Sequence, residues 1–180
     1  MDKKEFERIK AKVLELFAKA NVILTDLEKE SIEIADFGLN KIKDTGLQLI
    51  TYVNTEKVCA KELALLPYQT CPEHKHPPRG FDDGKEETFR CRYGTVYLYV
   101  EGEATKNRTM NPPEGDEEYY TAFKEIILYP GEQCTIYPNT LHWFKAGGEG
   151  AVVSEFSTRS TDESDIFTDP RIKRVPKITS

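Results

Sequence analysis

The feature that most constrains the fold of this chain is a close succession of short β-rich runs between residues 47 and 157. Gly, Pro and Asn residues separate these runs, as they do at the turns between short strands. Strands that follow one another this closely favour antiparallel pairing in a sandwich or a closed barrel. The expected strands are 47–53, 58–66, 69–75, 87–93, 95–100, 123–129, 133–137, 142–145 and 151–157.

Two helices are expected before the strands. Apolar residues from Phe6 to Phe17 recur at helical spacing, with Lys and Glu on the other face, so the first twenty residues predict one amphipathic helix. Thr25 as N-cap with Glu28 three residues later predicts a second helix, for which Gly38 is the expected end. We therefore expect one domain over 1–180, with N-terminal helices (1–38), a β-barrel (46–158) and a C-terminal segment (159–180).

Charge and composition restrict the partners. The net charge of -6 comes without a basic stripe, so nucleic acid is not an expected partner. No apolar signal-peptide region and no run long enough to cross a bilayer is visible, which predicts a cytoplasmic protein without membrane association. The four cysteines are irregularly spaced and lack a C-x-x-C pair, which favours reduced thiols that pack as small apolar groups.

All three histidines of the chain lie in two short stretches. His74 and His76 flank Lys75, and on an extended strand they project to the same side, so that both imidazoles can reach one ion. His142 and the carboxylate of Glu87 would complete a mixed nitrogen and oxygen set. Such a set suits Mn, Fe, Co, Ni or Zn better than Ca or Mg. Four protein ligands leave room for a substrate only on an ion that accepts five or six, which favours Mn, Co or Fe over tetrahedral Zn.

The alternative for each histidine is a surface or hydrogen-bonded residue, which is the more frequent case for a histidine taken alone. Here no histidine is found elsewhere, and every candidate lies beside strand-like sequence with Gly or Pro nearby. The sequence therefore favours a metal site.

The two stretches resemble the two motifs of the cupin superfamily. His74, His76, Glu87 and Gly94 match the first motif, and Gly131, Asn139 and His142 match the second. Three departures are visible. The spacing from His76 to Glu87 is longer than usual, the proline of the second motif stands at 138 instead of 137, and Asn139 replaces a glycine. Asn is the next best tolerated residue at a left-handed position, so the turn before His142 is expected to form.

A closer resemblance, over about residues 22–172, is to the D-lyxose isomerase family of sugar ketol-isomerases. It is carried by the runs at 47–49, 52–55, 71–78, 87–94, 96–103, 138–144 and 165–171. This resemblance implies a cupin barrel (a double-stranded β-helix or jelly roll), usually a homodimer, that holds a divalent ion, commonly Mn. It also implies a monosaccharide substrate, with interconversion of D-lyxose and D-xylulose and often of D-mannose and D-fructose.

An aldose–ketose isomerase needs a base for the carbon-bound proton and an acid that serves the oxygen. Glu155 interrupts the apolar run 151–156, so it lies either in the barrel interior, where burial raises its affinity for a proton, or at a solvent edge. The family resemblance favours Glu155 as the base. Lys85, two residues before Glu87, points to the same face if the strand already runs there, but it also follows Gly84 and reads equally well as a loop lysine.

Three further residues are expected to bind the sugar. Asp165 and Arg171, in the C-terminal segment, could close over the pocket as part of a lid, with a surface ion pair as the alternative. Trp143 follows a metal ligand and could stack on the sugar, while core packing is the expected task of Phe144. Asp-Pro and Val-Pro pairs favour an extended path for 165–180.

Two other functions remain open at this stage. Cupin sites with three histidines and one glutamate also activate dioxygen, so a metal-dependent dioxygenase is one alternative. A sugar-binding cupin without catalysis, in which the ion only braces the barrel, is the other.

Overall fold

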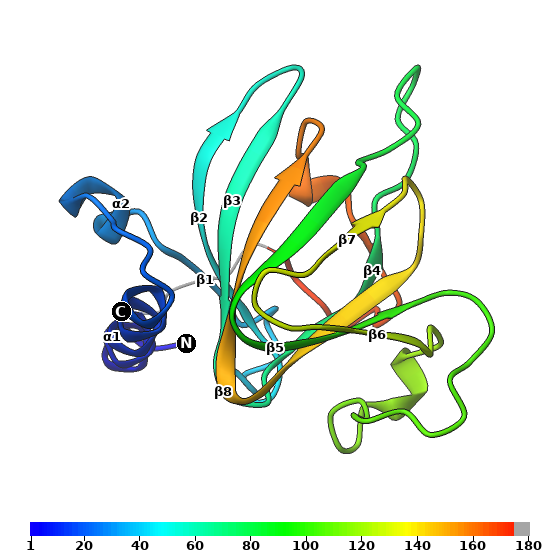
Figure 1. Ribbon diagram of the computed structural model, residues 1–180, viewed down its shortest axis with the longest axis horizontal. Coiled ribbons are helices and arrows are strands. Elements are labelled where there is room, and N and C mark those ends of the chain that lie inside the picture. The colour runs from blue at the N-terminus through cyan, green and yellow to red at the C-terminus, as the bar shows by residue number, and fades with distance from the viewer. Residues whose placement is uncertain (175–180) are drawn as a thin grey trace.

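The computed structural model describes residues 1–174 and shows a curled antiparallel β-sheet with its helices against one side (Figure 1). Within these residues nine strands join one sheet, and every pairing between them is antiparallel. The mostly β antiparallel barrel with N-terminal helices is therefore confirmed. The strands are β1 (Glu33–Ala35), β2 (Leu47–Asn54), β3 (Cys59–Leu65), β4 (Thr70–Lys75), β5 (Glu87–Val100), β6 (Lys124–Leu128), β7 (Gln133–Ile136), β8 (His142–Ser157) and β9 (Ile166–Phe167).

The two longest strands, β5 and β8, pair with each other along their whole length, from Glu87 opposite Ser157 to Val100 opposite His142. The sequence predicted each of them as two strands, and that division is wrong. Gly94 and Gly150 adopt left-handed φ values of 71° and 77°, and register shifts beside Gly94 let both strands bend while they continue. A glycine in a strand-like run therefore marks a bend of the barrel here, and not a strand end.

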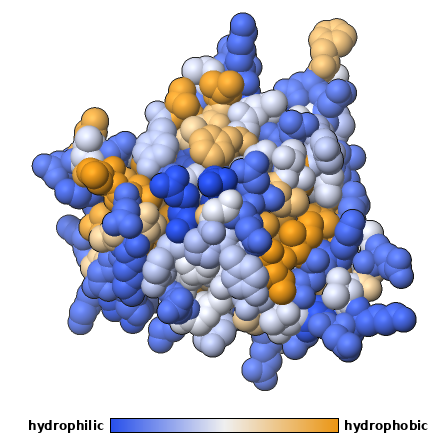
Figure 2. Space-filling view, in the orientation of Figure 1, coloured by the Kyte–Doolittle hydropathy of each residue, from blue (hydrophilic) through white to orange (hydrophobic). Residues whose placement is uncertain are grey.

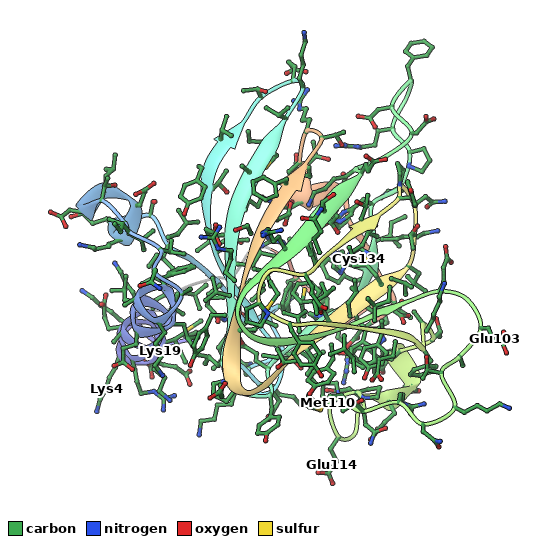
Figure 3. All side chains as sticks on the ribbon, in the orientation of Figure 1. Lys4, Lys19, Glu103, Met110, Glu114 and Cys134 are labelled. Carbon is green, nitrogen blue, oxygen red and sulfur yellow. The ribbon has the colours of Figure 1, made fainter. Side chains whose placement is uncertain are left out.

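The first predicted helix is confirmed as α1 (Lys3–Lys19), with Asp2 as its N-cap. Its apolar stripe packs on the outer face of the sheet, where Ile9, Val13 and Phe17 join a cluster with Ile50 and Val152. On its other face Lys4 points away from the barrel (Figure 3), whereas Lys19 Nζ lies 6.0 Å from the ring centroid of Tyr93 on β5. The helix therefore covers one face of the sheet and leaves the barrel interior to the strands.

The second helix is shorter than predicted. The capping box of Thr25 and Glu28 begins α2 (Asp26–Glu30), but the helix ends well before Gly38. The next residues form β1, which pairs with β2 and buries Ile34 and Ala35. Pairing with the sheet satisfies the backbone and buries these apolar side chains, which outweighs the weak helical signal of a short segment.

Polar side chains dominate the face seen in Figure 2, with apolar ones in small patches. Ile23 and Leu27, near α2, are among the exposed apolar residues. Neither helix of the described chain has the length and apolar character that crossing a bilayer requires.

A long loop lies at the side of the barrel (Figure 3). It carries Glu103, Met110, Glu114 and the 3-10 turn η1 (Glu117–Tyr119).

The C-terminal segment runs back across the barrel. It forms the 3-10 turn η2 (Asp162–Ser164) and then β9, which pairs with β4 through Phe167 opposite His74. The extended path predicted for 165–180 is thus observed around β9, while residues 175–180, with the Val-Pro pair, lie outside the described residues. This return path brings residues distant in sequence next to the histidine strand.

Candidate metal centre and pocket

The three histidines converge at one point of the barrel interior. Their nearest ring nitrogens lie within 4.8 Å of one another, and all three side chains are buried. His74 pairs directly with His142 across the β4–β8 ladder, and their ring centroids are 4.3 Å apart. Strand pairing therefore assembles the cluster that the sequence spacing predicted.

A β-bulge in β4 aims His74 at this cluster. The register between β4 and β8 shifts between Cys71 and His74. Without the shift the two side chains would point to opposite faces, because they are three residues apart. With it, both line the same pocket. The bulge thus lets one short strand supply a pocket residue and a ligand candidate on the same face.

Hydrogen bonds at Nδ1 fix the orientation of all three rings. His74 Nδ1 lies 2.8 Å from the carbonyl oxygen of Pro72, and His142 Nδ1 lies 2.9 Å from that of Thr140. A carbonyl oxygen only accepts, so Nδ1 carries the proton in both rings and Nε2 presents a lone pair. His76 Nδ1 lies 2.6 Å from the carboxylate of Asp165. Partners of this kind are typical of histidines that bind a metal through Nε2.

Glu87 completes the set. Its Oε1 lies 3.2 Å from His76 Nε2 and 3.0 Å from His142 Nε2. Within the described residues the fully buried Nε2 of His142 has no hydrogen-bond partner, so at that contact a lone pair faces an anionic oxygen. A cation between them would remove the repulsion and satisfy both atoms. The four residues therefore fit a divalent ion.

The electrostatics of the cluster also favour a cation. Burial, together with the neighbouring His142 and His76, holds the pKa of His74 well below its usual range, which leaves this ring in the neutral form that binds metals. Burial lowers the pKa of His76 as well, but Glu87 and Asp165 outweigh burial and raise it to about 9. The carboxylates around His76 thus make the local potential negative, and a metal ion could neutralise this charge.

Lys85 connects this cluster to Glu155. Its Nζ lies 2.6 Å from Glu87 Oε2 and 2.5 Å from Glu155 Oε1, and all three side chains are buried. Burial opposes the charge of Lys85, but the two carboxylates outweigh it and raise the pKa of the amine well above its usual range. Lys85 is therefore an ammonium inside the pocket, and the alternative of a solvated loop lysine is wrong.

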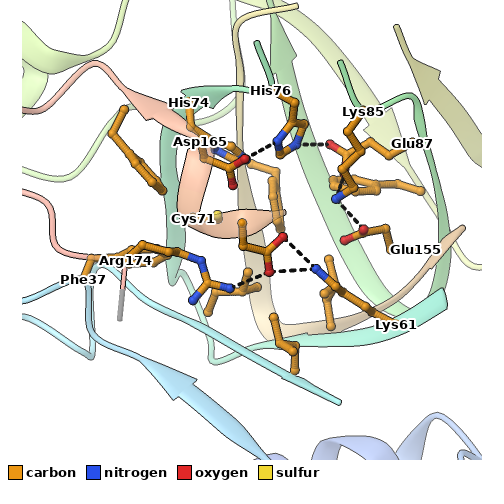
Figure 4. Close-up of a pocket in the computed structure, with 17 residues that line it drawn as sticks. Phe37, Lys61, Cys71, His74, His76, Lys85, Glu87, Glu155, Asp165 and Arg174 are labelled. Carbon is orange, nitrogen blue, oxygen red and sulfur yellow. Dashed lines mark hydrogen bonds and ion pairs between the residues drawn. The ribbon is translucent and has the colours of Figure 1, made fainter. Parts of the chain in front are cut away.

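A pocket lies above these residues and opens between the strands and the C-terminal segment (Figure 4). His142 is fully buried and is not among the residues that line the pocket. Of the residues expected to bind the sugar, Asp165 lines it. Three charged residues that sequence reasoning missed line it as well: Lys61, Asp162 and Arg174. Phe167 also lines it and stacks on His74, with 5.2 Å between the ring centroids.

Two expected sugar-binding residues do not reach this pocket. Trp143 stacks on Tyr99 with 4.0 Å between the ring centroids and donates from Nε1 to the carbonyl oxygen of Ala122, so it packs in a separate cluster. Its neighbour Phe144 faces the pocket instead, because successive side chains of β8 point to opposite faces. This reverses the tasks predicted for the two residues.

Arg171 is the other correction. Its guanidinium bonds the carboxylates of Asp116 and Asp169 and stacks over the ring of Tyr119, outside the pocket. The ion pair given as its alternative is therefore the one observed. Arg174, three residues later, takes the place in the pocket that the sequence assigned to Arg171.

The fold and this cluster define a protein of the cupin class, an antiparallel barrel whose interior carries three histidines and one glutamate that could hold a metal ion. The sequence model of D-lyxose isomerase matches residues 22–180. The chain belongs to the D-lyxose isomerase family, a family of sugar isomerases.

Two relatives cover almost the whole chain. The D-lyxose/D-mannose isomerase of Thermosediminibacter oceani is 64% identical over 99% of this chain and 98% of its own length. The D-lyxose ketol-isomerase of Cohnella laeviribosi is 58% identical over 97% of this chain and 96% of its own.

Solved structures agree on the fold. The L-ribose isomerase of Cellulomonas parahominis superposes with a TM-score of 0.78 at 14% identity, covering 99% of this chain and 98% of its own. That of Acinetobacter sp. DL28 gives a TM-score of 0.77 at 15% identity, covering 96% and 94%. At such low identity these similarities establish the barrel alone.

Proposed function

We propose that this chain interconverts D-lyxose with D-xylulose, and D-mannose with D-fructose, by metal-dependent proton transfer through an enediol. The names of two relatives support D-lyxose and D-mannose as the aldoses, and the ketoses follow from isomerisation of these two sugars. The observation that carries the proposal is the contact chain from Glu87 through Lys85 to Glu155. This chain of contacts supports a carboxylate base at Glu155, close to the histidine cluster in one pocket.

Aldose and ketose differ in the position of hydrogen on C1 and C2, so the reaction needs one base that removes a proton from one carbon and returns it to the next. Glu155 suits this task. Its Oε1 accepts from Lys85 and from Ser157 Oγ at 3.3 Å, while no hydrogen bond or ion pair from residues 1–174 reaches its Oε2. Oε2 is therefore available for the proton of the substrate carbon.

Lys85 stabilises the sugar oxygen that becomes negatively charged during the reaction. An ammonium has three donors, and Glu87 and Glu155 occupy two of them. The third stabilises the negative charge that develops on the sugar oxygen as Glu155 removes the proton. A divalent ion held by the three histidines and Glu87 would polarise the carbonyl and hydroxyl oxygens of the sugar.

For the ion we propose Mn first, followed by Co and Fe, with Ni and Zn as weaker fits. Four protein ligands leave positions for substrate oxygens only where five or six ligands are accepted.

We also propose a homodimer. Exposed apolar side chains on the outer sheet face support it, since Val53 and Phe156 both pair with Ala60 from neighbouring strands. Sedimentation velocity measures the assembly.

The experiment is an isomerase assay on a panel of pentoses and hexoses with chelated protein reconstituted with one metal at a time. We expect turnover of D-lyxose and D-mannose to vanish on chelation and to return with Mn or Co. Equal activity of the chelated protein would contradict metal dependence. Oxygen consumption without any aldose–ketose conversion would support the dioxygenase instead, and sugar binding without turnover would support the non-catalytic alternative.

A further inference from the structure

A second lysine lies next to the proposed base. Lys61 on β3 pairs directly with Glu155 on β8, and both side chains point into the pocket. Residues directly opposite in an antiparallel pair have Cβ atoms about 4.5–5.5 Å apart. The flexible side chain of Lys61 is therefore long enough to place its ammonium on the carboxylate of Glu155.

Lys61 instead points to the C-terminal segment. Its Nζ lies 2.9 Å from Ser160 Oγ and 2.9 and 2.8 Å from the two carboxylate oxygens of Asp162. The side chain of Lys61 is 4% exposed and that of Asp162 is 24% exposed, so the ammonium is buried and its partner is only partly so. Figure 4 shows Lys61 beside Glu155 with its nitrogen directed to the carboxylate that it shares with Arg174. All three donors of the ammonium are thus directed away from Glu155.

Arg174 holds that carboxylate from the other side. Its Nη2 donates to Asp162 Oδ2 at 3.0 Å, and its Nη1 pairs with Glu33 at the edge of the sheet. Burial raises the pKa of Asp162, but Lys61, Lys85 and Arg174 outweigh it and hold this pKa well below its usual range. Asp162 therefore stays ionised, and a carboxylate held so firmly in its ionised form is a poor proton acceptor itself.

An ammonium on Glu155 would impair the base in two ways. Lys85 already occupies Oε1, so Lys61 would take Oε2, the oxygen left for the substrate proton. A second positive charge would also stabilise the ionised carboxylate and weaken it as a base. The pocket needs a counter-charge for Lys61 that is not Glu155.

We propose that Asp162 is a positioning residue, which with Ser160 and Arg174 holds the Lys61 ammonium away from Glu155 and so keeps one oxygen of the base free. This inference rests on the proposed function of Glu155. It assigns no contact with the substrate to Asp162. If this is correct, substitution of Asp162 lowers kcat only because Lys61 then binds Glu155. Substitution of Lys61 in the same protein should therefore restore kcat.

Steady-state kinetics on D-lyxose with the metal-loaded protein tests this dependence. Asp162→Asn should lower kcat about tenfold or more with a smaller change in KM. The double variant Asp162→Asn/Lys61→Met should recover most of that loss, since the competing ammonium is gone. If Asp162 transferred protons, bound the sugar or only supported the fold, removing Lys61 would restore nothing, and the inference would be overturned.

Glu33→Gln is the matched control, because it removes the other carboxylate partner of Arg174 and leaves the Lys61–Asp162 pair intact. We expect it to keep the parent kcat. Thermal unfolding of each variant confirms that the compared proteins are folded.

A crystal structure of Asp162→Asn gives a readout that does not depend on turnover. Lys61 Nζ should lie within hydrogen-bond distance of the Glu155 carboxylate, and an unmoved Lys61 would overturn the inference. An inactive parent protein with Lys61 displaced in this variant would instead count against the proposed function, while the positioning contact would stand.

Discussion

His74 and His142 are directly opposed across the β4–β8 ladder, and each presents its Nε2 to the same point because a backbone carbonyl oxygen fixes its Nδ1. Each ring is thus oriented by the backbone carbonyl two residues before it, in β4 for His74 and in the turn before β8 for His142. The two Nε2 atoms are therefore oriented in advance, so that a single metal ion could bind both of them.

Substitution of His142 should therefore abolish stoichiometric metal binding. In His142→Gln the chain loses a fully buried nitrogen that has no hydrogen-bond partner among the described residues, so we expect the folded protein to bind Mn far more weakly. Metal content after gel filtration and calorimetric titration measure this. Cys71→Ala is the control in the same pocket, because burial keeps the pKa of this thiol well above its usual range and a protonated thiol is a poor ligand. Loss of metal from the control would contradict the ligand set.

Asp165 should tune the metal site without binding the ion itself. Its Oδ1 accepts from His76 Nδ1 at 2.6 Å, and loss of such a partner typically lowers metal affinity about 10–100-fold. We expect Asp165→Ala to show that drop in a titration with Mn. Asp169→Ala removes a second buried carboxylate of the same segment, which pairs with Arg171 outside the pocket, and should leave the affinity unchanged.

Glu155→Gln should remove turnover while metal and sugar still bind. The amide keeps the shape of the side chain but cannot accept the proton, and loss of a general base costs on the order of 10²–10⁴ in rate. Steady-state kinetics and the exchange of substrate hydrogen with deuterated water measure the loss. Glu62→Gln is a matched control one register position away, on the outer face, where Glu62 accepts from Ser154 Oγ at 2.6 Å. Parent-like turnover in Glu155→Gln would contradict the proposed role.

The convergence of the histidines was predictable from the sequence because much of its information is local. The i, i+2 spacing of His74 and His76 fixes their common face once the segment is a strand. The only other histidine of the chain is His142, so the third member of the cluster needed no choice. Asn139 adopts a φ of 58°, so the turn expected before His142 is confirmed. Strand parity and turn chemistry were sufficient for this part of the site.

The charged wall of the pocket was not predictable because its information is non-local. Lys61 and Asp162 are about a hundred residues apart, and they meet only through the register of β3 on β8 and the return of the C-terminal segment. The choice between Trp143 and Phe144 failed for a related reason. Alternation shows that one of the two faces inward, but the phase of β8 decides which, and pairing of Phe144 with Cys71 sets that phase.

Trp143 should matter for stability and not for the substrate. Replacement by Phe removes the hydrogen bond of 2.7 Å to the Ala122 carbonyl oxygen and leaves that buried acceptor unpaired, which costs about 1–3 kcal/mol. We expect a lower free energy of unfolding in urea with an unchanged KM for D-lyxose. Phe144→Leu is the comparison on the neighbouring, inward position and should raise KM. A raised KM in Trp143→Phe alone would place the indole at the sugar after all.

Gly94 should be the least replaceable glycine of the barrel. It has a left-handed φ of 71°, and an added Cβ would lie 2.0 Å from the carbonyl oxygen of Gly150, which belongs to the backbone and cannot turn away. Gly115 has a similar φ of 80°, but nothing lies within 4 Å of its added Cβ. Gly115→Ala therefore measures the conformational cost alone, about 1–2 kcal/mol. Gly94→Ala adds a backbone clash where β5 and β8 bend together, so we expect a cost of more than about 4 kcal/mol or failure to fold, measured by chemical denaturation of both variants. Equal costs in the two variants would show that the strands can separate at this bend, and that the barrel does not depend on their close approach.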